Sequence, residues 1–236
     1  MKKFIQSSAQ STAQVFAEHL FEKQLTSEKL NIALSGGSTP KLLFDILASE
    51  FSEKIDWKKI HLFWGDERCV LPTDSQSNYK MTLAHLISKV EIPEKNINRI
   101  LGENNSEVEA KRYASLLRTQ LTESNNIPQF DIIMLGLGED GHTASIFPHE
   151  MELLESEEVC VVATHPESGQ KRISLTGQVI NNAKEVCFLV TGTGKAEKVE
   201  EILYKTGGYK NYPASYIQPS SENLYWYMDE AAIARL

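Results

Sequence analysis

The residues best suited to chemistry lie in one segment, residues 136–148, which follows an apolar run at 130–135. Three glycines there surround a carboxylate and an imidazole, in the order Gly136, Gly138, Asp140, Gly141, His142. Glycines let the backbone turn sharply and approach a ligand closely, and an imidazole titrates near neutral pH. A strand that ends in such a turn is typical of a proton-transfer site. Asp140 and His142 are therefore candidate catalytic residues, and Gly138 is a candidate substrate contact.

The same glycines match the G-x-G-x-x-G spacing of dinucleotide-binding turns. That interpretation requires an uninterrupted helix after the glycines and an acidic residue at the end of the next strand, about 20 residues on. Here Pro148 interrupts the helix, and the next strand-like run, 159–164, ends without a carboxylate. The sequence therefore argues against a nicotinamide-nucleotide site.

A second group of residues with the chemistry for an anion follows the apolar run 31–34 and reads Ser35-Gly36-Gly37-Ser38-Thr39-Pro40. Small residues expose backbone N–H groups, hydroxyls donate hydrogen bonds, and the start of a helix adds the positive end of its dipole. The purely structural alternative is a capped helix start that binds no ligand. We expect a phosphate to bind here, through Gly36, Gly37, Ser38 and Thr39.

The charged run Asp66-Glu67-Arg68 directly follows the strand-like run 60–64. Such runs are often solvated surface groups, but ligands of α/β sheets bind beyond the carboxyl ends of strands. Arg68 is a candidate for stabilising an oxyanion or an anionic product, with Asp66 or Glu67 to fix its direction. Asp66 is also a candidate substrate contact.

Two further cations, Arg172 and Lys195, are candidates for binding the phosphate. Lys195 ends a glycine-containing loop at 191–195, at the start of a predicted helix. This is not a Walker A loop, because Leu189 stands where the first glycine is required and Ala196 replaces the magnesium-binding hydroxyl. The sequence therefore argues against nucleoside triphosphate hydrolysis. For either cation alone, a solvated surface position is the ordinary alternative.

Regular elements must position these loops, and apolar periodicity predicts where they lie. Helices are expected over 11–25, after Pro40, around Met81 to Ile87, after Ser106, over 194–205 and at the C-terminus. Strands are expected over 31–34, 60–64, 130–135, 159–164, 172–175, 185–190 and 224–228. Ser38 or Thr39 is the expected cap of the second helix, and Ser106 with Glu109 forms a capping-box pattern.

The alternation of strands and helices favours a mostly parallel sheet covered on both faces, in a single domain spanning residues 1–236. The loops that begin near Ser35, Gly65, Gly136 and Thr191 all follow predicted strands. Carboxyl ends of parallel strands meet at one edge of a sheet. We therefore expect these four loops to converge on one cleft.

Composition narrows the class of protein. The 236 residues carry 32 acidic and 24 basic side chains, a net charge of −8, which argues against a general nucleic-acid or anionic-membrane surface. The first residues lack the apolar core of a signal peptide, and no run approaches a membrane span, so a cytoplasmic protein is expected. Cys69, Cys160 and Cys187 are far apart and predict reduced, mostly buried thiols, with neither a disulfide framework nor a zinc site.

Taken together, these motifs resemble the 6-phosphogluconolactonase family. The blocks that carry the resemblance are Ser35 to Pro40, Trp64-Gly65-Asp66-Glu67-Arg68, Gly136 to Pro148 and Lys171-Arg172-Ile173. They occur in order along nearly the whole chain, and the block around His142 is the most specific. Glucosamine-6-phosphate deaminases share the serine–glycine loop and the G-x-G-x-D-G-H core. They place Ile-Ala-Phe-Asn-Glu-Pro where this chain has Thr143 to Pro148, and Asp-Glu-Tyr where it has residues 66–68.

The resemblance implies a three-layer α/β/α sandwich with a modified Rossmann-like sheet, no nucleotide site, no cofactor and no required metal. It also implies hydrolysis of 6-phospho-D-glucono-1,5-lactone to 6-phospho-D-gluconate, in the oxidative pentose phosphate pathway. For this reaction we expect His142 to activate water as a general base. Asp140 would orient it or bind a sugar hydroxyl, while Arg68 and the backbone N–H groups of 136–141 are candidates for stabilising the oxyanion.

Two other functions stay open on the sequence. An amino-sugar-phosphate deaminase or isomerase needs a carboxylate that removes a proton beside the carbonyl, and Asp66 is its best candidate. A non-catalytic sugar-phosphate sensor would keep the phosphate loop without needing Asp140 and His142. No helix-turn-helix extension is evident that would couple such a sensor to DNA. A monomer and a homodimer are both compatible with the sequence, as are 1,5- and 1,4-lactones.

Overall fold

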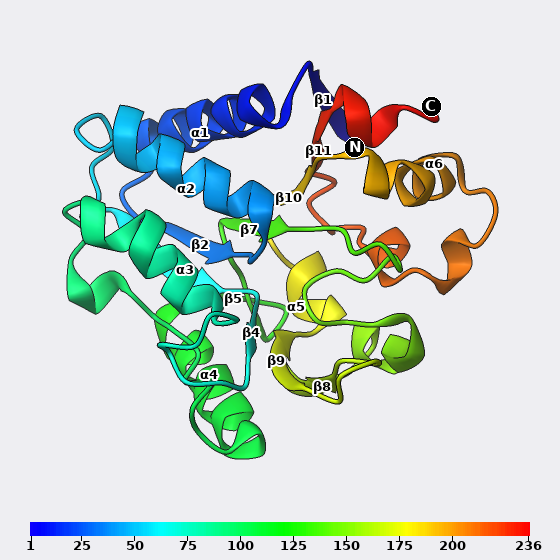
Figure 1. Ribbon diagram of the computed structural model, residues 1–236. Coiled ribbons are helices and arrows are strands. Elements are labelled where there is room, and N and C mark those ends of the chain that lie inside the picture. Colours follow the sequence, from blue (N-terminus) through cyan, green and yellow to red (C-terminus); the bar gives the residue numbers. More distant parts are fainter.

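A six-stranded parallel sheet forms the centre of the molecule, whose residues 1–236 are all described by a computed structural model (Figure 1). In spatial order its strands are β1 (Lys2–Gln6), β11 (Leu224–Asp229), β10 (Val186–Val190), β7 (Ile132–Leu135), β2 (Leu30–Leu34) and β3 (Ile60–Trp64). Every neighbouring pair is parallel. Strands β7 and β10 are buried along their whole length, as expected for a sheet covered on both faces.

Helices cover both faces of this sheet and complete the predicted α/β/α sandwich (Figure 1). They are α1 (Ala9–Thr26), α2 (Ser38–Glu50), α3 (Asn78–His85), α4 (Ser106–Gln120), α5 (Gly177–Asn181) and α6 (Ala196–Tyr204). Helices α1 and α2 pack together on one face, while α4 lies on the other and its Tyr113 hydroxyl accepts a hydrogen bond from the backbone N of Trp64 (2.9 Å). No helix has the length and apolar character needed to span a membrane.

A second, smaller sheet is antiparallel and was not expected as a separate unit. It contains β4 (Asp66–Arg68), β9 (Lys171–Leu175) and β8 (Cys160–Thr164), with β9 in the middle. The prediction of a loop that begins near Gly65 is wrong at residues 66–68, because β4 pairs there with β9. The chain turns out of the main sheet at Gly65, whose carbonyl accepts the backbone N of Leu175 (2.8 Å).

Several local predictions need correction. Helix α2 is capped by Gly37 rather than by Ser38 or Thr39, which are already its first helical residues. Helix α4 is capped by Asn105, whose side chain accepts the backbone N of Val108, so the capping box at Ser106 is wrong. Strand β1 was missed because, at the edge of the sheet, it is mostly exposed and carries no apolar run.

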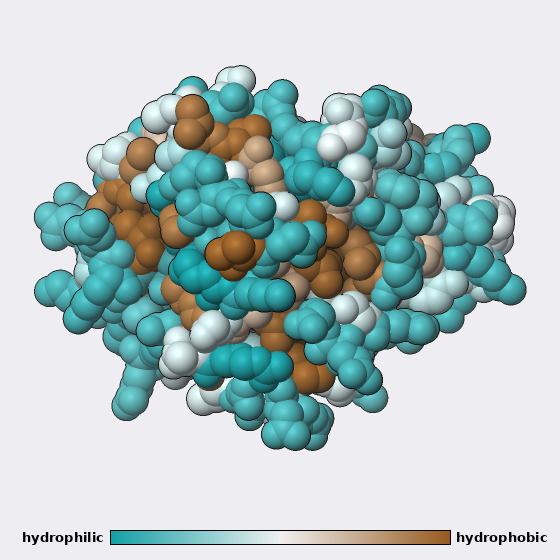
Figure 2. Space-filling view, turned by 90° about the horizontal axis from the view of Figure 1, so that it is seen from below, coloured by the Kyte–Doolittle hydropathy of each residue, from teal (hydrophilic) through white to brown (hydrophobic).

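The remaining elements are short. A two-stranded hairpin is formed by β5 (Glu123–Ser124) and β6 (Ile127–Pro128). Seven 3₁₀ helices join the larger elements: Ile87–Lys89, Glu94–Asn96, Pro148–Leu154, Thr193–Lys195, Tyr209–Asn211, Pro213–Tyr216 and Glu230–Ile233. Polar side chains dominate the face seen from below, with apolar side chains in separate patches between them (Figure 2). That distribution is ordinary for a globular protein.

The strand order decides where a ligand can bind. From β2 the chain passes to β3 on one side, and it later returns to β7 on the other side of β2. Loops leaving β2 and β7 therefore diverge and open a crevice at the carboxyl ends of these strands. The loops after β3 and β10 border the same crevice, since these strands lie next to β2 and β7.

Candidate active site

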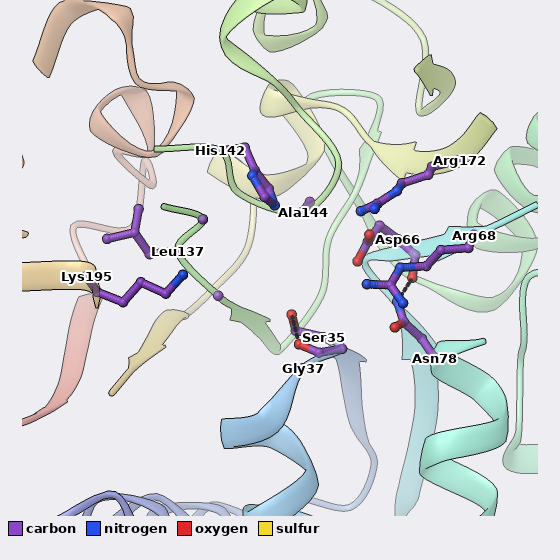
Figure 3. A pocket seen from close by; sticks show the side chains of 13 residues that line it. Ser35, Gly37, Asp66, Arg68, Asn78, Leu137, His142, Ala144, Arg172 and Lys195 are labelled. Atoms are coloured by element: carbon purple, nitrogen blue, oxygen red, sulfur yellow. Dashed lines mark hydrogen bonds between the residues drawn. The ribbon is translucent and has the colours of Figure 1, made fainter. Parts of the chain in front are cut away.

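A polar pocket of about 200 Å³ lies at this crevice (Figure 3). Residues from all four predicted loops and from β9 line it: Ser35, Gly36, Gly37, Asp66, Arg68, Asn78, Gly136, Leu137, Gly138, His142, Ala144, Arg172 and Lys195. The prediction that the four loops converge is confirmed. Of the predicted site residues, Ser38, Thr39 and Asp140 do not line this pocket.

His142 and Asp140 form a hydrogen-bonded pair, with His142 Nδ1 2.6 Å from Asp140 Oδ1. Burial opposes ionisation of Asp140, but the hydrogen bond and charge of His142 outweigh it and lower the pKa of Asp140 to about 2. At neutral pH Asp140 is thus a carboxylate that can only accept, so Nδ1 must carry the proton. The neutral imidazole then has its free lone pair on Nε2, and the ring points into the pocket (Figure 3).

The backbone of the turn is held by its own hydrogen bonds. The N–H of Gly138 donates to the carbonyl of His142 (2.8 Å), and the N–H of Gly141 donates to the carbonyl of Gly138 (3.1 Å). Gly141 has φ +89°, and a Cβ atom at Gly138 would lie 2.1 Å from His142 Nδ1, so both positions require glycine. The expectation that these N–H groups serve an oxyanion is wrong for Gly138 and Gly141, because both already have partners.

The loop after β2 contributes Ser35 and the backbone of Gly36 and Gly37 to the pocket, but not the hydroxyls of Ser38 and Thr39. Gly36 and Gly37 line it, and Gly37 begins α2 without a side-chain cap, so the first turn of the helix lacks that side-chain acceptor. The Thr39 hydroxyl is instead hydrogen-bonded to Thr191 (2.7 Å) and mostly buried. Ser38 borders an adjacent surface groove. Ser38 and Thr39 also line a smaller adjoining pocket of about 150 Å³ together with Lys195, so their role toward a phosphate stays a prediction.

Two arginines stand side by side at one end of the pocket (Figure 3). Arg68 of β4 and Arg172 of β9 are directly paired across the antiparallel ladder. Arg68 donates to the carbonyl of Gln76 (2.5 Å), and the Arg172 guanidinium lies 5.4 Å from the Phe147 ring. Neither forms an ion pair, and the Nε atom of each is buried without a partner. Like charges directly opposite each other are destabilising, and an anion between them would relieve the repulsion.

The carboxylates beside Arg68 are buried and do not steer its guanidinium. Glu67 accepts the backbone N–H groups of Asn78 and Tyr79 (both 2.8 Å) at the start of α3. Burial raises the pKa of Glu67, although these hydrogen bonds oppose the shift. Asp66 accepts from the Ser145 hydroxyl (2.6 Å). The run 66–68 is therefore not a solvated charge cluster, and the carbonyl of Gln76 directs Arg68 instead of Asp66 or Glu67.

Lys195 lies across the pocket from the two arginines (Figure 3). Its Nζ atom is 3.7 Å from Glu139 Oε1, a weak contact because the Glu139 side chain is 77% exposed. The pocket thus has cationic groups at both ends and the imidazole of His142 between them. Such a pocket fits a substrate or product with two separated centres of negative charge.

Asn78 is a pocket residue that sequence reasoning missed. It is buried at the first position of α3, and its Nδ2 atom donates to the carbonyl of Asp66 (2.9 Å). Ser35, Gly136, Leu137 and Ala144 also line the pocket. These four belong to motifs recognised in the sequence, whereas no local pattern marks Asn78, because only the fold carries the start of α3 to β4.

Side chains of the kinds that bind metal ions lie close together at another place, near the opposite end of β10. Ligand atoms of His19, Glu185 and Cys187 lie within 4.8 Å of one another. Glu185 is already paired with His19 Nε2 (2.9 Å) and with Lys23. The Cys187 thiol is fully buried, which raises its pKa well above the ordinary value. This cluster is well explained as a partly buried ion-pair network between α1 and the start of β10.

Comparison with known proteins places the chain in a family. The model for glucosamine-6-phosphate isomerases/6-phosphogluconolactonase matches residues 5–226. The chain is 47% identical over 203 residues to a 6-phosphogluconolactonase of Treponema pallidum, covering 86% of this chain and 84% of that protein. It is 42% identical over 230 residues to a 6-phosphogluconolactonase of Haemophilus influenzae, covering 97% of each.

Solved structures agree with this assignment. The crystal structure of the devB protein superimposes with a TM-score of 0.96 at 43% identity, covering 100% of this chain and 99% of that one. The 6-phosphogluconolactonase of Trypanosoma brucei superimposes with a TM-score of 0.87 at 28% identity, covering 100% and 98%. The chain therefore belongs to the glucosamine-6-phosphate isomerase/6-phosphogluconolactonase family.

Proposed function

We propose that this protein hydrolyses 6-phospho-D-glucono-1,5-lactone to 6-phospho-D-gluconate, a step of the oxidative pentose phosphate pathway. The observation that carries the proposal is the imidazole of His142, oriented by Asp140 in a polar pocket with cations at both ends. Relatives at 47% and 42% identity are named 6-phosphogluconolactonase, which supports the same substrate. The product carries a phosphate at one end and a new carboxylate at the other, and this matches the two cationic ends.

His142 acts as the general base. Its Nδ1–H is held by Asp140, so Nε2 removes a proton from a water molecule as the water oxygen bonds to the lactone carbonyl carbon. The tetrahedral intermediate collapses by breaking the bond between that carbon and the ring oxygen. The imidazolium returns its proton to the ring oxygen, which becomes a hydroxyl. Asp140 stabilises the imidazolium between the two proton transfers.

The oxyanion of that intermediate is held by arginine. Because the N–H groups of Gly138 and Gly141 are engaged within the turn, Arg68 and Arg172 are the better placed donors. Their mutual repulsion falls as negative charge develops on the substrate oxygen. Asp66, buried beside them, is placed to accept a hydrogen bond from a sugar hydroxyl.

The phosphate binds between the start of α2 and Lys195, where Gly36, Gly37 and Lys195 line an adjoining pocket. The backbone of Gly36 and Gly37 at the start of α2 and the ammonium of Lys195 provide N–H donors and positive charge there. The sequence suggested Arg172 for this role, but Arg172 stands beside Arg68, across the pocket from Lys195 (Figure 3). Binding of the phosphate holds the lactone carbonyl near His142. The binding energy of the phosphate, which takes no part in the reaction, thus orients the reacting group.

The test is to generate the lactone in situ in weakly buffered solution and to compare acid release with and without protein. Since the lactone also hydrolyses on its own, the difference in rate is the measurement. Substitution His142→Ala is expected to lower kcat at least a hundredfold, the usual scale of general-base catalysis. His149→Ala is a matched control, because His149 also contacts the Phe147 ring but does not line the pocket. Equal rates for wild type and His142→Ala would contradict the proposal.

Asp66 keeps a deaminase as the second candidate, because a buried carboxylate in the pocket is what proton abstraction beside a carbonyl needs. Asp66 Oδ2 is, however, occupied by the Ser145 hydroxyl. We expect no ammonia from glucosamine 6-phosphate under conditions in which the lactone is hydrolysed. Ammonia release that depends on Asp66, without lactone hydrolysis, would favour the deaminase. Tight binding of 6-phosphogluconate without either reaction would favour a sensor.

A further inference from the structure

The segment between α6 and β11 folds back onto the turn that carries His142. The Tyr212 ring packs directly against Gly141, since a Cβ atom built there would lie 2.5 Å from Tyr212 Cγ. Two residues on, the backbone N of Ala214 donates to the carbonyl of Gly141 (3.2 Å). Gly141 stands between Asp140 and His142, so this segment contacts the turn at its central residue.

Tyr212 is itself fixed by helix α6. Its hydroxyl donates to Glu201, and Lys198 donates to the same hydroxyl (3.0 Å). The Lys198 ammonium also lies 4.7 Å from the centre of the Tyr212 ring. Hydrogen bonds from Tyr212 and from the backbone N of Gly208 lower the pKa of Glu201, which keeps it a carboxylate acceptor. The ring is therefore held on one face and at its hydroxyl.

The geometry of the turn depends on what touches Gly141. With φ +89°, Gly141 has a conformation that few other residues adopt, and its flexibility would let the flanking residues rotate. The Tyr212 ring and the Ala214 hydrogen bond remove that freedom. The inference rests on the proposed function, because it presumes that His142 is the base. We propose that Tyr212 is a positioning residue, which holds the Asp140–His142 pair in its productive orientation through Gly141.

A positioning role predicts a specific kinetic change. Tyr212 does not line the pocket, so Tyr212→Ala should leave the KM for the lactone within about twofold. A displacement of about 1 Å at the reacting group costs up to a hundredfold in rate, so kcat should fall roughly tenfold to a hundredfold. Tyr212→Phe keeps the ring against Gly141 and loses only the hydroxyl contacts. It should restore kcat to within about threefold of wild type.

Tyr216→Ala is the matched control. Tyr216 lies in the same segment, is exposed, and its hydroxyl donates to the carbonyl of Lys210 (2.9 Å). Its kcat and KM should equal those of wild type. The melting temperature of each variant is measured alongside, so that a loss of fold is not read as a loss of positioning.

The kinetics of these variants test the positioning role of Tyr212. A fall in kcat for Tyr212→Ala, with KM unchanged and kcat restored in Tyr212→Phe, supports the positioning role. A kcat equal to wild type in folded Tyr212→Ala overturns it, as does a change confined to KM or an equal loss in Tyr216→Ala. If wild type itself does not hydrolyse the lactone, the proposed function fails. If wild type is active and His142→Ala is not, only the role of Tyr212 is at stake.

Discussion

At the scale of single residues, the site depends on how each polar group is already occupied. Asp140 can orient His142 because its pKa of about 2 keeps it ionised at neutral pH. The N–H groups of Gly138 and Gly141 cannot serve an anion, because they are bound within the turn. The arginines retain donors that face the pocket and have no carboxylate partner. The polar groups that have no partner within the protein therefore indicate the roles more clearly than the list of residues in the pocket does.

Substitutions at the two cationic ends of the pocket should affect different kinetic constants. In the proposed mechanism Lys195 contacts the phosphate alike in the ground state and the transition state, so Lys195→Ala should raise KM about tenfold with kcat nearly unchanged. Arg68→Ala removes the proposed donor to the charge that develops in the transition state. Its kcat should fall about a hundredfold. Initial rates over a range of lactone concentrations measure both constants, and the reverse pattern would exchange the two ends.

At the scale of elements, a buried carboxylate joins strand β4 to helix α3. Glu67 accepts the backbone N–H groups of Arg68, Asn78 and Tyr79, as well as the Ser77 hydroxyl. It therefore acts as the acceptor for the first turn of α3 and places Asn78 and Arg68 beside the pocket. The sequence showed the Glu67 carboxylate but not this role, because most of the groups that donate to Glu67 follow it after the loop between β4 and α3.

Glu67→Ala should leave several buried donors without a partner. We expect the free energy of unfolding to fall by about 2–4 kcal/mol, the usual cost of buried unsatisfied groups. Urea denaturation followed by circular dichroism measures the change. Glu91→Ala, an exposed carboxylate, is the control and should lie within about 0.5 kcal/mol of wild type. An equally small effect for Glu67→Ala would show that α3 does not depend on this acceptor.

At the scale of the whole molecule, an ion-pair network that stabilises the fold and the candidate active site lie at opposite ends of the strands of the main sheet. Glu185, just before β10, pairs with His19 and Lys23 of α1 and is largely buried. The pocket lies beyond the other end of β10, where the chain reaches Lys195. A change at the first site should therefore affect folding without affecting the reaction.

Glu185→Ala tests this separation. At neutral pH the variant loses the hydrogen bonds from His19 and Lys23, and the Lys23 side chain that remains is 38% exposed, so the free energy of unfolding should fall by about 1–3 kcal/mol. The kcat and KM should stay within about twofold of wild type. Burial opposes ionisation of Glu185, but His19 and Lys23 outweigh it and lower its pKa below the ordinary 4.5. Its stabilisation is therefore present above pH 4.5 and is lost as the pH falls through the lower folded value. The gap between wild type and variant, measured by urea denaturation, should narrow on acidification below that pH.

Much of the fold follows from local patterns in the sequence. The predicted run 60–64 is a strand in the structure, and the predicted run 185–190 is a strand over 186–190. Four loops after strands form one pocket, because parallel strands place their carboxyl ends together. The edge strand β1 and the antiparallel pairing of β4 with β9 could not be found this way. Each depends on a partner more than 100 residues away, at Tyr225 for Lys2 and at Ser174 for Asp66.

The sequence by itself determined the chemistry of the candidate base, because Asp140 and His142 are two residues apart and a glycine turn brings their side chains together locally. It also identified Arg68, Arg172 and Lys195, the three cations that line the pocket. Only the tertiary structure decided which cations lie at which end of the pocket. It also decided that Tyr212 packs against Gly141. These arrangements are contacts between distant segments, whose geometry is set by the packing of the whole sheet rather than by local spacing.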